Sequence, residues 1–146
     1  MKKSEKVILF ALCAILILLF AFLQYKKIEE KSGNRRVGYV YFLKNIDEHT
    51  YLVGIKRPIP LFAPIENKIG SLINSLLVGP NEEEKKEDIS TSLPEGVKLL
   101  SVRKIEDTIY LDFSEEIEQG GGISLMETRL AQIVFTATQF PEVKKV

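Results

Sequence analysis

The sequence is poor in the residues that bind metal ions or cross-link small domains. Its 146 residues include one cysteine, Cys13, one histidine, His49, and no tryptophan. A single cysteine forms no intrachain disulfide and supplies too few thiolates for a zinc site. The fold must therefore be held together by packing and hydrogen bonds alone.

Neither sign of charge predominates in the chain. It carries 20 basic and 20 acidic side chains, and from residue 32 onward the balance is 14 − 17 = −3. Domains that bind nucleic acid usually carry a basic excess gathered on one surface. We therefore expect no nucleic-acid partner.

Charged residues are absent from one long stretch, the apolar run from Val7 to Leu23. As a helix rising about 1.5 Å per residue, this run with Gln24 and Tyr25 spans most of a hydrocarbon core about 30 Å thick. We expect residues 1–25 to be an N-terminal signal-anchor. In this prediction a single transmembrane helix holds the protein in the membrane through residues 7–25.

A cleaved export signal is the competing interpretation, because lysines precede the apolar run. Cleavage requires small residues near the end of the run, but the segment Ala21–Leu23 ends in leucine. Lipidation of Cys13 is also disfavoured, since Leu12 precedes it where a small residue is needed. These patterns favour an anchor that is not cleaved.

Basic residues flank the apolar run on both sides, so their distribution does not fix its orientation. Long domains are translocated largely regardless of flanking charge. We expect the N-terminus in the cytoplasm and the following domain on the extracytoplasmic side of the cytoplasmic membrane. Residues 26–36 are rich in charge and contain Ser32-Gly33-Asn34, a composition typical of a tether.

The remaining residues, 37–146, are enough for one small domain. Two β-rich segments, Val37–Leu43 and Tyr51–Ile55, flank a polar turn at 45–50 and predict a hairpin. A helix then follows Pro64 and stops at Gly79-Pro80. Its apolar residues recur on one face, which we expect in the core: Ile65, Ile69, Leu72, Ile73, Leu76 and Leu77.

A second hairpin and a second helix follow. Strands are predicted at Val97–Arg103 and Thr108–Phe113, with a tight turn at Glu106-Asp107 between them. Ser124 and Glu127 have the spacing of a capping box at the start of the second helix. Its apolar stripe is predicted to consist of four residues: Leu130, Ile133, Val134 and Ala137.

Two segments lie outside this pattern. Asn81–Ser92 is acidic and broken, which is typical of a solvated loop with a frayed helical turn, with an acidic partner surface as the alternative. Val143–Val146 has the composition of the beginning of a strand. The order ββαββα predicts a small α+β domain in which two helices pack on a mixed sheet of about four strands.

No group of residues has the composition of a catalytic centre. His49 lies in a polar turn without other metal ligands near it in sequence. Asp112, Glu115 and Glu116 come closest to a carboxylate pair, but no obvious partner accompanies them, and an acidic loop is the simpler interpretation. Gly120–Gly122 lacks the lysine and hydroxyl residue of a phosphate loop and indicates a flexible loop or hinge. We expect no catalytic, cofactor or metal site, and a protein that is not an enzyme.

Several stretches of the domain resemble the GerMN domain of sporulation and spore-germination proteins and of envelope lipoproteins. They are residues 72–80, 93–102, 109–114 and 130–143. The resemblance implies a small α+β module outside the cytoplasmic membrane, without known catalytic residues, used in protein assembly at the cell envelope. Members of the family commonly continue into a final strand beyond the position of Val146, so we expect the domain at 37–146 to lack that strand. An unpaired sheet edge there would be open to strand addition by another chain. A frayed C-terminus or an incomplete reading frame is the simpler interpretation.

Two functions remain open at this point. The first is a non-enzymatic envelope protein whose GerMN-like domain binds other envelope or sporulation proteins; a homo-oligomer is compatible with it. The second is a module that binds cell-wall glycan or assists a wall-processing enzyme. For the second, the candidate stacking residues are Tyr39, Tyr41 and Tyr110.

Overall fold

The structure is a computed structural model that describes residues 15–20 and 37–146. Residues 15–20, from the middle of the apolar run, are helical. Across these two ranges no helix has both the length and the apolar character that crossing a bilayer requires. The rest of the predicted anchor (1–25) and the whole predicted tether (26–36) lie outside the described residues.

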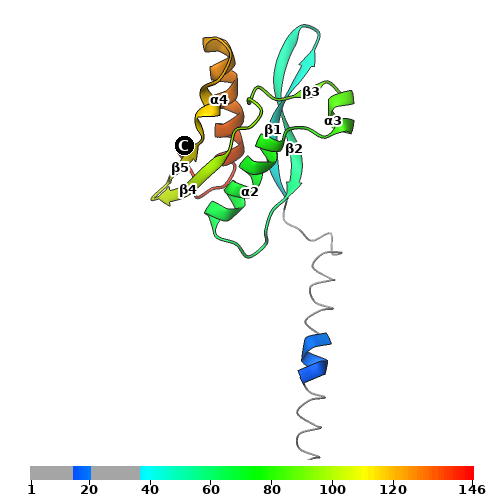
Figure 1. Ribbon diagram of the computed structural model, residues 1–146, viewed down its shortest axis with the longest axis vertical. Coiled ribbons are helices and arrows are strands. Elements are labelled where there is room, and N and C mark those ends of the chain that lie inside the picture. The colour runs from blue at the N-terminus through cyan, green and yellow to red at the C-terminus, as the bar shows by residue number, and fades with distance from the viewer. Residues whose placement is uncertain (1–14, 21–36) are drawn as a thin grey trace, which may run out of the picture. The chain divides into compact units, whose positions relative to one another are not determined.

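The first predicted hairpin is present and longer than expected. Strands β1 (Val37–Ile46) and β2 (His49–Pro58) pair antiparallel along their whole length (Figure 1). Only Asp47 and Glu48 form the turn, both with positive φ (46° and 67°). Two-residue turns of this kind match the twist of the strands, which explains why pairing continues through the polar residues predicted as loop.

The acidic segment contains more structure than the solvated loop with a frayed helical turn that the sequence predicted. Helix α3 (Glu82–Lys86) begins with a capping box between Asn81 and Glu84, and strand β3 (Ile89–Ser90) follows. β3 pairs antiparallel with β1 at Leu43 and Lys44, so the sheet order is β2-β1-β3. The predicted solvated loop is therefore wrong in part, because its last residues add a strand to the first sheet.

The second hairpin forms a sheet of its own. Strands β4 (Leu99–Ile105) and β5 (Thr108–Phe113) pair with each other, and the described residues contain two antiparallel sheets rather than the single mixed sheet we predicted. The C-terminal tail begins a further strand, as expected, because the Ile109 amide donates to the Lys145 carbonyl (2.9 Å) in a parallel bridge with β5.

Helix α2 (Ile65–Val78) lies between the two hairpins and forms the centre of the core (Figure 1). Four of the six residues of its predicted apolar face are buried, and Ile65 and Leu77 are partly buried. The helix packs closely enough on β4 that the Cβ position of Gly70 lies 3.5 Å from Val102. The helix ends at Gly79, whose φ of 85° favours glycine. The buried core includes Val40, Phe42, Ile69, Leu72, Ile73, Leu76, Ile109 and Ile133.

Helix α4 (Ile123–Ala137) follows the short 3-10 helix η1 (Glu115–Glu118), and its details differ from the prediction. The N-cap residue is Gly122, so the predicted capping box at Ser124 and Glu127 is wrong: Ser124 lies inside the first turn. The predicted apolar stripe is only half buried, since Leu130 and Val134 are exposed. The buried face of α4 is instead mostly polar, because it includes Arg129, Gln132 and Thr136.

Candidate interaction surfaces

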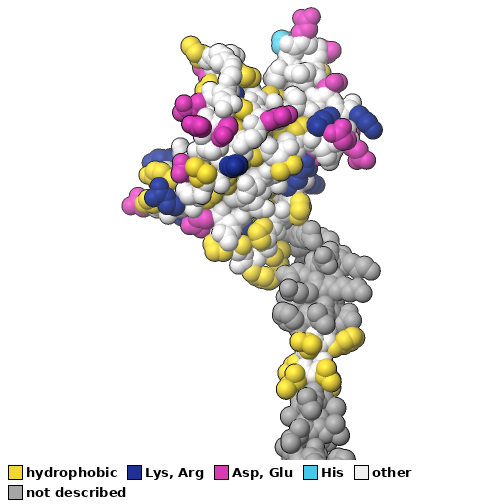
Figure 2. Space-filling model, viewed as in Figure 1, with side chains coloured by type: hydrophobic (Ala, Val, Ile, Leu, Met, Phe, Trp, Pro, Cys, Tyr) yellow, Lys and Arg dark blue, Asp and Glu magenta, His cyan; other side chains and the backbone are white. Residues whose placement is uncertain are grey.

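The residues singled out for chemistry do not gather into one site. His49 lies at the end of the first hairpin, where its ring meets that of Tyr51 edge-on with centroids 6.4 Å apart. Figure 2 shows this histidine, in cyan, beside acidic side chains. Asp112 is exposed on β5, whereas Glu115 and Glu116 lie on η1. In the part of the chain that the structure describes, no three potential ligands come together to hold a metal ion.

The glycine-rich loop is bound by a buried arginine. Arg129 on α4 is almost completely buried and donates hydrogen bonds to carbonyls that lead into the loop, Gly120 included (3.4 Å), and to one on the segment after β3. Its Nη1 donates to Ile117, its Nη2 to Gln119 (3.2 Å), and its Nε to Ser92 (3.2 Å). Carbonyl groups of the loop thus turn toward a cation inside the protein. The loop is not arranged as a phosphate cradle, in which amides would point outward.

Polar residues of α4 take the place of a neighbouring strand along the N-terminal half of β1. The side-chain amide of Gln139, just beyond the helix, bonds both backbone groups of Tyr39, accepting from N–H (2.7 Å) and donating to the carbonyl (2.8 Å). Thr136 accepts from the Tyr41 amide (3.1 Å), and Gln132 donates to the Tyr41 carbonyl (3.0 Å). β3 continues this coverage at Leu43. We call this the covered edge, and it explains why the buried face of α4 is polar.

Gln132 also holds the segment that follows β3. Its Oε1 accepts from the amide (2.8 Å) and the hydroxyl (2.7 Å) of Ser92. Because Gln132 is fully buried, these bonds are made without competition from water. One side chain therefore joins the first sheet, the β3 segment and the last helix.

Two of the three predicted stacking tyrosines share a surface on the first hairpin. On β1, Gly38 faces α2, so the alternating Tyr39 and Tyr41 lie on the opposite, outer face. Both pack against the Cβ position of Gly54, within 3.2–3.5 Å, and the Tyr41 ring lies 5.6 Å from that of Phe135 on α4. Tyr39 and Phe135 keep 39% and 51% of their surface exposed. We call Tyr39, Tyr41 and Phe135 the aromatic face; Tyr110 lies apart from it, on β5.

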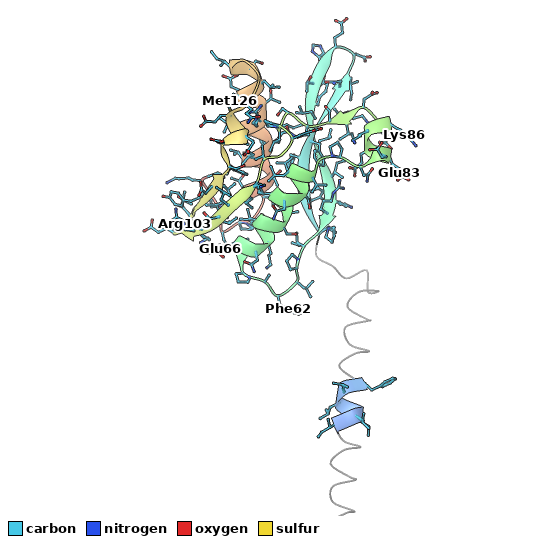
Figure 3. The ribbon with its side chains drawn as sticks, viewed as in Figure 1. Phe62, Glu66, Glu83, Lys86, Arg103 and Met126 are labelled. Atoms are coloured by element: carbon cyan, nitrogen blue, oxygen red, sulfur yellow. The ribbon has the colours of Figure 1, made fainter. Side chains whose placement is uncertain are left out.

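An open groove lies along α2, beside β4 and the segment that follows β2. It has a volume of about 1240 Å³ and is lined by amide and hydroxyl side chains of α2, among them Asn67, Ser71 and Asn74. Glu66 marks the start of α2 in Figure 3, and Phe62 projects from the preceding loop. Three separate segments build this groove, which is why no local pattern in the sequence indicated it.

One end of the groove carries a two-point ion pair. Arg57 at the end of β2 donates through Nη1 and Nη2 to the two carboxylate oxygens of Glu84 on α3 (2.8 and 2.6 Å). This hydrogen-bonded guanidinium lowers the pKa of Glu84 below its ordinary value. The pKa of Glu116 is also lowered, chiefly by a hydrogen bond from the Ser114 hydroxyl. Both carboxyl groups are therefore ionised near neutral pH, a state that does not suit a general acid.

Comparison with known proteins gives a consistent picture. Residues 39–146 match the family model Germane, described as sporulation and spore germination. The tandem GerMN domains of the sporulation protein GerM from Bacillus subtilis are similar in structure, with a TM-score of 0.59 and 26% identity over 75% of this chain. A candidate lipoprotein from Clostridium perfringens shares the fold, with a TM-score of 0.51 and 23% identity over 75% of this chain and 70% of its own. The match covers 36% of the tandem protein, and no curated protein matches the chain.

Proposed function

The chain belongs to the Germane family of sporulation and spore-germination domains, as its GerMN-like motifs predicted, and on this basis we propose a non-enzymatic role in protein assembly at the cell envelope. In this proposal the domain at 37–146 binds other envelope or sporulation proteins.

The observation that carries the proposal is the aromatic face. Large aromatic side chains exposed next to one another are typical of surfaces that bind proteins, and tyrosine and phenylalanine are enriched there. Here Tyr39, Tyr41 and Phe135 come from two elements far apart in the sequence. The covered edge of β1 fixes their spacing, because Gln139 and Thr136 hold both tyrosine backbones. The backbones of the two tyrosines are therefore held by the part of the chain that also carries Phe135.

The membrane anchor forms part of the same proposal. The apolar run at 7–23 supports attachment to the cytoplasmic membrane by a single pass, with the domain on the extracytoplasmic side. The lipoprotein description of the Clostridium perfringens relative supports a membrane location for such domains, although that protein would use a lipid. A reporter fused after Val146 tests the side on which the domain lies.

The test of the assembly role is cross-linking in cells from the full-length chain. Phe135 is replaced by a photoreactive phenylalanine analogue, and Ile105 on β4, of similar exposure (55% against 51%) and outside the groove, is replaced in the same way as the control. We expect envelope proteins to be cross-linked from position 135 and not from position 105. Equal cross-linking from both positions, or none from 135, would contradict the proposal.

The groove along α2 favours a second function, binding of cell-wall glycan. Its asparagine and serine side chains offer donors and acceptors that match sugar hydroxyl groups. The test is sedimentation of the detergent-purified full-length chain with insoluble peptidoglycan. Retention that is lost in Asn74→Leu and kept in Phe135→Ser would favour glycan binding in the groove over the aromatic face.

A further inference from the structure

The outer edge of β2 contrasts with the covered edge of β1. β2 pairs only with β1, at one side of the sheet order β2-β1-β3. Because Ile46 and His49 close a two-residue turn, the backbone groups of alternate residues point away from β1: Thr50, Leu52, Gly54 and Lys56. Within the described residues, the one such group with a hydrogen bond is the Lys56 carbonyl, which accepts from Arg57 Nη1 (3.2 Å). We call this the open edge.

An open edge of this length is a template for another strand. Natural sheets usually protect such an edge by charge, proline or a covering element. Here the middle of the strand, Tyr51–Ile55, carries neither a charged residue nor proline. The protective residues are confined to its end, at Lys56 and Pro58.

The charges at the two ends of β2 identify the kind of strand that fits. Asp47 and Glu48 precede the strand in the turn, and Lys56 and Arg57 lie near its end. An antiparallel second copy brings acidic residues opposite basic ones, whereas a parallel copy brings like charges together. Arg57 already binds Glu84, which leaves Lys56, an exposed residue, as the cation for such a contact.

We propose that two copies of this chain associate through β2, edge to edge and antiparallel, about a two-fold axis at Leu52. In this register Leu52 faces Leu52 of the second copy, Thr50 faces Gly54, and Glu48 faces Lys56. The backbone groups that point outward from Thr50, Leu52 and Gly54 then bond one another across the axis. The proposal goes beyond the assembly function, which requires only one copy.

The geometry of the hairpin agrees with this arrangement. A two-fold axis between antiparallel strands stands perpendicular to the sheet, so the outer faces of both copies lie on the same side. Gly54 has no side chain, and the Tyr39 and Tyr41 rings fill the outer face above it. Two aromatic faces would then be joined in one continuous sheet, which doubles the surface offered to a partner.

The experiment uses the full-length chain in membranes, with Cys13 changed to serine so that an introduced cysteine is the only thiol. Leu52→Cys places a thiol at the axis, and Leu100→Cys, on β4, is the matched control. A short bis-maleimide reagent is expected to produce covalent dimer from position 52 and none from position 100. Charge reversal then tests the register, through Lys56→Glu, Glu48→Lys and the double variant.

Each outcome decides the proposal. Either single reversal should lower the dimer yield roughly ten-fold, since two like-charge contacts replace two attractive ones, and the double variant should restore it. Three results would overturn the proposal. The first is a failure of position 52 to cross-link, and the second is cross-linking to a different protein in place of a second copy. The third is a dimer yield that does not change on charge reversal. None of these outcomes depends on the partner test at Phe135, so the two proposals fail separately.

Discussion

The outward backbone groups along the two long edges of the first hairpin are hydrogen-bonded to different extents. Along β1, three side chains from the C-terminal part of the chain and the short strand β3 bond the outward backbone groups from Tyr39 to Leu43. Along β2, the matching groups of Thr50, Leu52 and Gly54 point away from the sheet. The difference shows that a helix can cover a strand edge when it presents polar side chains. In this hairpin the helix covers the edge of β1 and leaves that of β2 open.

The largest expected effect comes from breaking the covered edge at its buried end. Gln132→Leu removes the amide that bonds the Tyr41 carbonyl and Ser92, and leaves those groups buried without partners. We expect the free energy of unfolding to fall by about 3 kcal/mol, measured by chemical denaturation. Val134→Gln, on the exposed side of the same helix, is the control and should change it by less than about 0.5 kcal/mol. A similar loss in both variants would show that helix content rather than edge coverage matters.

The same chemistry near the surface should matter less. Gln139→Leu removes two bonds to the Tyr39 backbone, but water can reach and replace them there. We expect a loss of about 1.5 kcal/mol in the same denaturation experiment. A loss as large as that of Gln132→Leu would mean that burial does not set the strength of the covered edge.

The end of β2 that is fastened by Arg57 and Glu84 should respond to pH. The pKa of Glu84 is lower in the folded protein than its unfolded value of about 4.5. The ion pair therefore contributes its full stabilisation above about pH 4.5, and this stabilisation is lost as the pH falls through the lower, folded-state pKa. We expect Glu84→Gln to cost about 1 kcal/mol at pH 7. The difference from the unchanged chain should shrink toward pH 3 in parallel denaturation series. A difference that is constant with pH would contradict the role of this ion pair.

The smallest effect is expected at the open edge. Thr50→Lys changes an exposed residue whose backbone bonds no other element among the described residues, so the free energy of unfolding at low protein concentration should change by less than about 0.5 kcal/mol. A loss above 1 kcal/mol would show that this edge is covered after all and would remove the contrast between the two strands.

The sequence predicted the parts of this fold that depend on apolar burial. The helix at α2 and both hairpins follow from local periodicity, and four of the six residues predicted on the apolar face of α2 are buried. The buried face of α4 was not, because Arg129, Gln132 and Thr136 are buried for the sake of hydrogen bonds to distant backbone. Pattern analysis assigns such residues to the solvent side.

The candidate surfaces were predictable only in part. Tyr39 and Tyr41 were named as candidate stacking residues, but Phe135 joins them through tertiary packing that has no local signal. The groove along α2 depends on three segments brought together by the fold. β3 was missed because two residues are too few to show strand periodicity.

The covered edge also sets an order of events during synthesis. Tyr39 and the side chain that bonds it, Gln139, are separated by 100 positions along the chain. At about 10 residues per second, roughly ten seconds pass on the ribosome between the two. Any hairpin that β1 and β2 form in that interval has both edges exposed, and contacts so distant in sequence form slowly once they can form. The nascent chain thus depends on its last helix to protect β1 from pairing with the wrong strand. A chain released before Gln139 would expose two unpaired strand edges, on β1 and β2, rather than one.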